Sequence, residues 1–414
     1  MIKIILSFIL ILILISACII FIGCEEQEQQ LGKKFSYDDD GMLLINGQRT
    51  FIIGTYHLPK SEKPYQELAQ AGFNYVRIAA KKETLDEAHN NGLMTWISTG
   101  SIRENDEEED QKRFKELLAK FRTHPSLLCW EIEDEPAYTW KSAQARIEPH
   151  QLIKTYQLIK QEDPLHLVYT NHAPVNLIST MQQYNPGTDI IACDIYPVIP
   201  HGIRITYALN PDGLQGDLLN PYLSQVGEYT DKMHAVSQRR KPVWMVLQGF
   251  AWEMLRKIDD RDPAMIRYPT YDETRFMAYN AIIHGATGIV YWGTAYTPQP
   301  SNFWSDLKKV TAELSESKYL LEAPRLDWQI QKVYHEMGHS IDAGVEILVK
   351  NIHDKTYMIT ANADKNLVKV SFKVIGNSSK AKVLNEDRVI EVQDNTLTDT
   401  YRPFDVHVYE LYEN

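Results

Sequence analysis

The alternation of apolar strand patterns with amphipathic helix patterns over residues 51–321 constrains the fold of this chain more than any other feature. The expected strands cover 51–56, 74–78, 93–97, 127–132, 167–170, 190–195, 243–247 and 288–292. The expected helices cover 65–71, 83–90, 106–122, 147–161, 175–184, 221–239, 271–284 and 305–321. Eight such units in about 270 residues match a (β/α)8 barrel, whereas doubly wound sheets rarely reach eight units in strict order. We therefore expect an α/β fold, a TIM barrel.

The segments that flank the barrel predict β-structure. Residues 37–47 are typical of a short hairpin with Asn46-Gly47 as its turn. Beyond Ala323-Pro324 the pattern changes to short β-rich runs at 345–349, 356–360, 368–374 and 407–411, with turn signals at Gly376-Asn377 and Asp394-Asn395. We expect a barrel with its hairpin over 37–325 and a small antiparallel β-sandwich over 333–414.

The N-terminal residues predict an export signal. Lys3 precedes an almost wholly apolar run, 4–22, and a polar run, 25–30, follows it. Cys18 and Cys24 both resemble the lipidated cysteine of bacterial lipoproteins. Cys24 is favoured because lipidation at Cys18 would leave 19–23 as an apolar stub on the mature chain. We expect a signal peptide over 1–23, a polar tether over 24–36, and a lipid-anchored protein of the cell envelope, at the bacterial outer membrane or cell surface. An uncleaved membrane anchor is the alternative.

The sequence gives little indication of a cofactor, a metal or a nucleic-acid partner. Cys129 and Cys193 each lie in an apolar strand and are expected to be buried thiols, not a disulfide. No cysteine or histidine spacing suggests a metal site, and no Gly-rich phosphate loop is present, so we expect no cofactor and no metal. The net charge of −12 argues against nucleic acid as a partner.

The run 130–136, Trp-Glu-Ile-Glu-Asp-Glu-Pro, is the strongest candidate for chemistry. An apolar strand leads directly into acidic residues, which are costly to desolvate, and Pro136 ends the strand. In (β/α)8 enzymes the C-terminal strand ends carry the catalytic groups. An acidic first turn of the next helix is the structural alternative.

This run resembles the fourth-strand motif of clan A glycoside hydrolases, in which Asn-Glu-Pro closes the strand. The resemblance implies that Glu135 is the general acid/base and that Asp134, in place of the Asn, holds a substrate hydroxyl. It also implies that Arg77 at the end of strand two binds the nucleophile and that Trp292 at the end of strand eight forms the floor of a sugar site. The C-terminal sandwich, with 402–409 as its last strand, resembles the module appended to many barrel glycosidases.

Other strand ends supply further candidates. Asp194 and Tyr196 share one side of strand six, so we expect a catalytic or substrate contact from them. His57 and His172, after strands one and five, are expected to contact sugar hydroxyls, with loop capping nearly as plausible. Aromatic residues that suit a glycan groove crowd the loops of the same face: Tyr138, Trp140, Trp252, Tyr268, Tyr271, Tyr296, Phe303 and Trp304.

Strand seven departs from the resemblance, because Gln248 stands where the family has its nucleophilic Glu. An amide cannot form the glycosyl-enzyme ester. Three possibilities remain: another carboxylate takes the role, with Asp194 first and Glu133 second; the enzyme is inverting and a more distant carboxylate activates water; or the substrate supplies the nucleophile through an acetamido group that Gln248 helps to position.

The sequence thus favours a lipid-anchored glycoside hydrolase that acts on an extracytoplasmic oligo- or polysaccharide. The alternative is a glycan-binding lipoprotein that kept the groove and lost the nucleophile. A lyase or esterase is less favoured, because the chain has no Gly-x-Ser-x-Gly elbow and no metal cluster.

Overall fold

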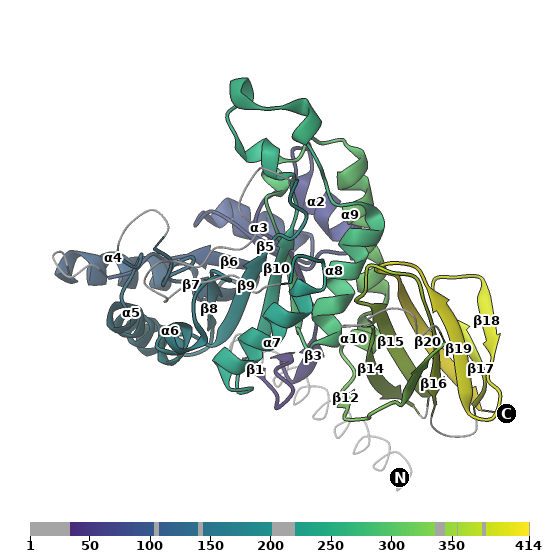
Figure 1. Cartoon of the computed structure of the whole chain (residues 1–414). Helices are drawn as coiled ribbons and strands as arrows, with labels where there is room; N and C mark the ends of the chain where they lie inside the picture. The colour runs from purple at the N-terminus through teal and green to yellow at the C-terminus, as the bar shows by residue number, and fades with distance from the viewer. Residues whose placement is uncertain are drawn as a thin grey trace, which may run out of the picture.

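A closed barrel of parallel strands forms the body of the protein (Figure 1). The computed structural model describes residues 34–102, 107–139, 144–200, 220–335, 344–353, 355–374 and 378–413. Around the barrel the order is β10-β11-β4-β5-β6-β7-β8-β9, so strands adjacent in the chain are neighbours and the last closes on the first. The strands are β4 (Ile52–Thr55), β5 (Tyr75–Arg77), β6 (Met94–Ser98), β7 (Leu127–Glu131), β8 (Leu167–His172), β9 (Ile190–Ile195), β10 (Val243–Gln248) and β11 (Gly288–Trp292). The predicted TIM barrel is confirmed.

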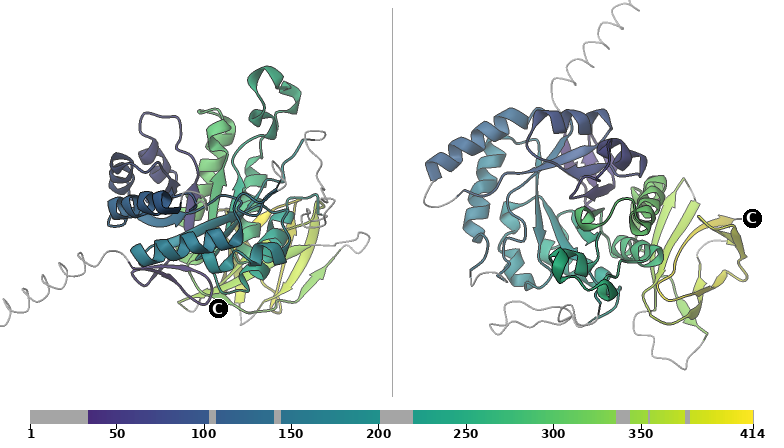
Figure 2. Two further views of the ribbon diagram at one scale, coloured as in Figure 1. Left: turned by 90° about the vertical axis from the view of Figure 1, so that its left-hand side faces the viewer. Right: turned by 90° about the horizontal axis from the view of Figure 1, so that it is seen from above.

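Helices surround the barrel, as Figure 2 shows from above. They are α2 (Pro64–Gln70), α3 (Lys82–Asn90), α4 (Glu107–Phe121), α5 (Pro149–Glu162), α6 (Ile178–Gln182), α7 (Gln225–Ser237), α8 (Tyr271–Ile283), α9 (Asn302–Glu316) and α10 (Lys318–Leu321). Two helices begin later than expected. Asn176 donates its side-chain amide to the carbonyl of Ala137, which holds the residues before α6 extended, and Asn220 accepts from the Tyr222 backbone in a turn before α7.

Aromatic side chains fill the interior of the barrel. Tyr75 stacks on Trp96 with ring centroids 4.4 Å apart, and the hydroxyls of Tyr56 and Tyr169 are 2.9 Å apart. Gly288 makes room for this packing, because a Cβ there would lie 2.7 Å from the indole of Trp244. A second apolar layer lies between the strands and the helices. Aromatic rings together with aliphatic side chains such as Ile52, Val246 and Val290 therefore form the packed core beneath the C-terminal strand ends.

A small antiparallel sheet closes the N-terminal end of the barrel. It consists of β1 (Phe35–Tyr37), β2 (Leu43–Ile45) and β3 (Gln48–Thr50). Asn46 and Gly47 have φ of 52° and 82°, which suits a type I′ turn. The predicted Asn46-Gly47 turn is confirmed. It joins β2 to β3, so the sheet extends beyond the expected bounds 37–47 and has a third strand.

The C-terminal residues form two antiparallel sheets packed around a separate apolar core. The larger has the order β12-β14-β15-β20-β17-β18 and the smaller the order β13-β16-β19. The strands are β12 (Arg325–Leu326), β13 (Lys332–Tyr334), β14 (Val345–Ile352), β15 (Lys355–Asn362), β16 (Val368–Lys373), β17 (Ser378–Val383), β18 (Arg388–Glu391), β19 (Thr396–Tyr401) and β20 (Val406–Glu413). The sequence did not predict β12, β13 and β17–β19, because these segments are short or mostly polar.

Several other expectations can be compared with the structure. Cys129 and Cys193 are buried free thiols, as predicted. Asp394 and Asn395 both have positive φ in the turn before β19, whereas Gly376-Asn377 lies outside the described residues. The signal segment, Cys18, Cys24 and Trp140 also lie outside them. Within the described ranges, no helix has the length and apolarity needed to cross a membrane.

Candidate active site

Polar side chains gather where the barrel strands end. The alternation along each strand that sends Tyr75, Trp96 and Tyr169 into the barrel also directs its last inward residue toward the axis. Those last residues are Arg77 (β5), Ser98 (β6), Glu131 (β7), Asn171 (β8), Asp194 (β9), Gln248 (β10) and Trp292 (β11). The C-terminal end of the barrel is therefore polar and carries two carboxyl groups directly on its strands.

Glu131 is a site residue that the sequence analysis did not single out. Its side chain is 2% exposed, and its Oε2 lies 3.3 Å from Nε of Arg77 and accepts from Ser98. Burial, followed by the charge of Asp134, raises the pKa of Glu131 to about 7. Arg77 therefore pairs with the β7 acid, whereas the resemblance placed it beside a nucleophile on strand seven.

Glu135 lies just beyond β7 in a strained backbone conformation. Its φ is 48°, which is uncommon outside glycine, and its N–H donates to the carbonyl of Asn171 at 2.9 Å. Arg146 binds the carboxylate, with Nη2 2.7 Å from Oε2, and also donates to the carbonyl of Asp134 at 2.7 Å. Arg146 comes from the segment before α5, so sequence spacing gave no reason to select it. This clamp fixes the orientation of Glu135.

Asn171 connects two acids. Its Nδ2 lies 3.0 Å from Oδ1 of Asp134 and 3.2 Å from Oδ1 of Asp194. Asp194 is 9% exposed, and burial together with the charges of Glu135 and Asp134 raises its pKa well above the usual range. Asp194 therefore favours its neutral form, while the ion pair with Arg146 favours a charged Glu135.

Glu133 lies on the loop between these groups and is half-buried. Burial is the main cause that raises its pKa, and the nearby Arg146 opposes this shift. The structure thus brings Asp134, Glu135 and Asp194 into one hydrogen-bonded and charge-coupled group, with Glu133 at its border.

Aromatic rings form a platform beside the acids. Tyr196 stacks on Trp292 with centroids 5.6 Å apart, and His57 approaches Trp292 edge-on at 5.9 Å. Trp252 donates its indole N–H to the carbonyl of Tyr196 at 3.2 Å, and Tyr296 is 43% exposed. Burial, followed by the charge of Arg77, lowers the pKa of His57 to about 4, so its ring is neutral near pH 7. This aromatic platform can pack against the CH face of a sugar.

Two predicted substrate contacts occupy different places from those expected. Gln248 is fully buried; its Oε1 accepts from the N–H of Val198, and its Nε2 donates to the carbonyls of Val198 and Phe250. Gln248 thus holds the loop after β9, and its amide is not presented to a substrate. His172 is also fully buried and faces outward, edge-on to Tyr184, instead of into the barrel mouth.

The predicted loop aromatics do not all lie at the candidate active site. Phe303 and Trp304 are buried in the body of the protein, and Trp304 donates to Glu67 at 2.8 Å. Composition alone could not separate these core residues from those of the aromatic platform.

Among the residues that the structure describes, no group of three or more His, Cys, Asp or Glu side chains is placed so that it could hold a metal ion. The acids of the site are instead bound by Arg146, Arg77, Ser98 and Asn171. The carboxyl groups of this site can transfer a proton, attack as a nucleophile, or activate water as a general base.

Comparison with known proteins shows likeness in structure only. No protein-family model matches the chain, and no curated protein matches its sequence. Among solved structures, it is similar to a glycoside hydrolase at 13% identity, covering 92% of this chain and 97% of that one, with a TM-score of 0.59. A family 5 glycoside hydrolase from Bacteroides vulgatus ATCC 8482 is 12% identical, with coverages of 92% and 93% and a TM-score of 0.60.

An α-amylase from Geobacillus thermoleovorans, solved in complex with acarbose, is 10% identical, with coverages of 92% and 100% and a TM-score of 0.54. At such identities these likenesses show the fold. The chain has the barrel architecture of solved glycoside hydrolases over nearly its whole length.

Proposed function

We propose that this protein is a lipid-anchored glycoside hydrolase that cleaves an extracytoplasmic oligo- or polysaccharide, with Glu135 and Asp194 as its catalytic pair. One observation carries the proposal. Two carboxyl groups lie at the C-terminal end of the barrel beside the aromatic platform: Asp194, whose pKa is raised, and Glu135, which is in an ion pair with Arg146. Glycoside hydrolysis needs one carboxyl group as acid and one carboxylate as base or nucleophile.

The electrostatics favour an exchange of the roles expected from the sequence. Asp194 holds a proton because it is buried beside two other acids, so it is the group able to protonate the leaving oxygen. Glu135 is paired with Arg146 and acts as the carboxylate, either as nucleophile or as the base for water. Asn171 donates to Asp194 and holds its side chain in place, and Asp134 accepts a second hydrogen bond from the same amide of Asn171.

Substrate binding follows from the same geometry. The sugar packs on Trp292 and Tyr196, and the neutral His57 ring beside Trp292 can exchange hydrogen bonds with a hydroxyl. Gln248 is fully buried and both of its amide hydrogens bond backbone carbonyls, so it has no donor left for an acetamido group and a substrate-assisted route through Gln248 is not favoured.

The experiment is a hydrolysis assay of the purified protein on a panel of neutral and acetamido glycans. Glu135→Gln and Asp194→Asn should each lower kcat by about 10²–10⁴-fold while glycan affinity is retained. Glu83→Gln, on the exposed first turn of α3, is the matched control and should keep wild-type turnover. Wild-type turnover in Asp194→Asn, with loss in Glu133→Gln, would assign the partner role to Glu133.

A glycan-binding protein without activity is the second candidate. The buried amide of Gln248 at the strand-seven position favours it, because the usual carboxylate is missing there. Binding of several glycans without turnover of any, with affinity lost in Trp292→Ala, would support this candidate over the hydrolase.

A further inference from the structure

A cavity of about 180 Å³ lies at the opposite end of the barrel from the candidate active site. Phe51, Lys241 and Thr287 line it, and each lies just before a barrel strand, so the cavity is at the N-terminal strand ends. Its other walls come from the β1–β3 sheet and from β12 and β14 of the sandwich. In Figure 1 these elements lie together with α7 and α10 at the lower end of the barrel.

The lining is strongly basic. Five cationic side chains and one histidine face two acids, and the basic residues are Arg49, His234, Arg239, Lys241, Arg325 and Lys350. Three of them are already engaged: Arg49 pairs with Asp40 at 3.1 Å, Lys241 donates to Thr188 at 2.5 Å, and Lys350 donates to Ala323 at 2.7 Å.

The remaining groups have unused donors. Within the described residues, the side chains of Arg239 and Arg325 form no ion pair. His234 is 92% buried, no side chain bonds its ring nitrogens, and the backbone of Gly285 is the neighbouring polar group. Both His234 and Arg325 approach Gly285: a Cβ there would lie 2.8 Å from Nε2 of His234 and 3.4 Å from Nη1 of Arg325. Glycine at residue 285 thus lets the imidazole and the guanidinium approach the same stretch of backbone at the edge of the cavity.

Lys350 adds a buried basic group to the lining of the cavity. Its side chain is 5% exposed, and burial, followed by the charge of Arg49, lowers its pKa to about 7. Asp40 and Glu322 oppose this shift only in part, and a bound anion would further stabilise the ammonium form of Lys350. Arginine forks and an imidazole N–H suit the oxygens of a tetrahedral anion.

We propose that this basic cavity binds a tetrahedral oxyanion, either phosphate or sulfate, free or as the headgroup of a larger molecule. Arg239, Arg325 and His234 supply the donors. Because the three walls belong to the N-terminal sheet, the barrel and the sandwich, the bound anion links these parts. This site is independent of the proposed hydrolase activity and lies far from its residues.

The test is calorimetric titration of the full chain with inorganic phosphate and with sulfate at constant ionic strength, with chloride as the balancing anion. Arg325→Gln and Arg239→Gln should each weaken binding by about 10-fold, the value of one charge-assisted hydrogen bond. Both residues are exposed, so these variants should fold. Arg240→Gln is the matched control, because it removes the same charge from the neighbouring residue, which does not line the cavity; it should bind as the wild type does.

Stability and lipid binding complete the test. Saturating phosphate should raise the Tm of the wild type by about 2 °C or more and leave the Tm of the Arg239→Gln/Arg325→Gln double variant unchanged.

Vesicle binding distinguishes the two sources of the anion. If the wild type binds phosphatidylglycerol vesicles more tightly than the double variant does, relative to phosphatidylcholine vesicles, the source is a lipid headgroup; no difference would identify a free anion. Absence of phosphate and sulfate binding, or equal binding in Arg325→Gln and Arg240→Gln, would overturn the proposal.

Discussion

Glu135 of the candidate active site has a strained backbone conformation. Its φ of 48° places a side chain in the left-handed region, which costs about 1–2 kcal/mol. Such strain persists where the surrounding structure imposes it, and it is enriched at active sites. Here Arg146 and the carbonyl of Asn171 impose it.

This strain predicts that Glu135→Gly is more stable than Glu135→Ala by about 1 kcal/mol, although both lack the carboxylate and both are inactive. Chemical denaturation of the two variants measures the difference. The reverse order of stability would show that the left-handed backbone at this residue is not retained in solution.

Glu131 predicts a pH dependence of stability. A carboxyl group whose pKa rises from 4.5 to about 7 on folding binds a proton more strongly in the folded state, so stability falls as pH rises through this interval. The full effect is on the order of 3 kcal/mol. Glu131→Gln removes this pH-dependent stabilisation. The unfolding free energy of the wild type, minus that of the variant, should therefore decrease between pH 5 and pH 8. A constant difference would mean that Glu131 titrates normally in the folded protein.

The sequence could predict part of the site at this scale. Strand parity was sufficient to select Asp194 and Tyr196, because a strand directs its side chains without reference to the rest of the fold, and the family resemblance pointed to Trp292. It could not predict Arg146 or the role of Asn171, which depend on how a loop and a neighbouring strand meet β7. It also misplaced Gln248, whose partners lie on the loop after β9.

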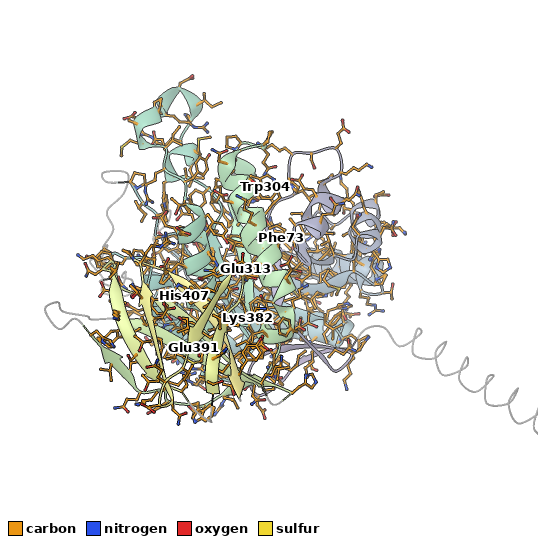
Figure 3. The ribbon with its side chains drawn as sticks, turned by 90° about the vertical axis from the view of Figure 1, so that its right-hand side faces the viewer. Phe73, Trp304, Glu313, Lys382, Glu391 and His407 are labelled. Carbon is orange, nitrogen blue, oxygen red and sulfur yellow. The ribbon has the colours of Figure 1, made fainter. Side chains whose placement is uncertain are left out.

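Among the elements, α8 and α9 connect the barrel to the sandwich. Arg275 of α8 binds Glu313 of α9 at 2.8 Å and donates to the carbonyl of Val406 on β20 at 2.7 Å. Tyr279 and Tyr271 donate to the same carboxylate. Figure 3 shows Glu313 on its helix next to the sandwich strands, with His407 also labelled. This buried pair orients both helices against the larger sheet.

We expect Glu313→Gln to destabilise the protein by about 3–5 kcal/mol, because it leaves the Arg275 charge buried without its partner. Glu316→Gln on the exposed side of α9 is the control and should change stability by less than about 0.5 kcal/mol. Equal effects of the two substitutions, measured by urea denaturation, would contradict a role for Glu313 at this junction.

Strand and helix order was predictable at the element scale, because hydrophobic periodicity is local. The polar strands β17 (Ser378–Val383) and β19 (Thr396–Tyr401) were not, since half of their side chains face solvent and pairing with other strands determines their structure.

For the whole molecule, the sequence predicts an anchored protein whose N-terminal residues precede the β1–β3 sheet. Cys24→Ala should release the protein from membranes, because lipidation at this cysteine is proposed to provide the anchor. Cys18→Ala is the control and should leave the protein in the membrane fraction. Fractionation of cells that express each variant measures this, and release by Cys18→Ala alone would assign lipidation to Cys18.

In the proposed mechanism Asp194 donates the proton, and Glu135 is the carboxylate that attacks the sugar or activates water. The most direct measurement compares hydrolysis of a natural glycan and of an aryl glycoside with a good leaving group by Asp194→Asn and Glu135→Gln. A good leaving group needs no proton, so Asp194→Asn should be severely impaired on the glycan and near wild type on the aryl glycoside, whereas Glu135→Gln should lose at least about 10²-fold on both. The opposite pattern, with Glu135→Gln restored by the aryl leaving group and Asp194→Asn inactive on both substrates, would contradict the account.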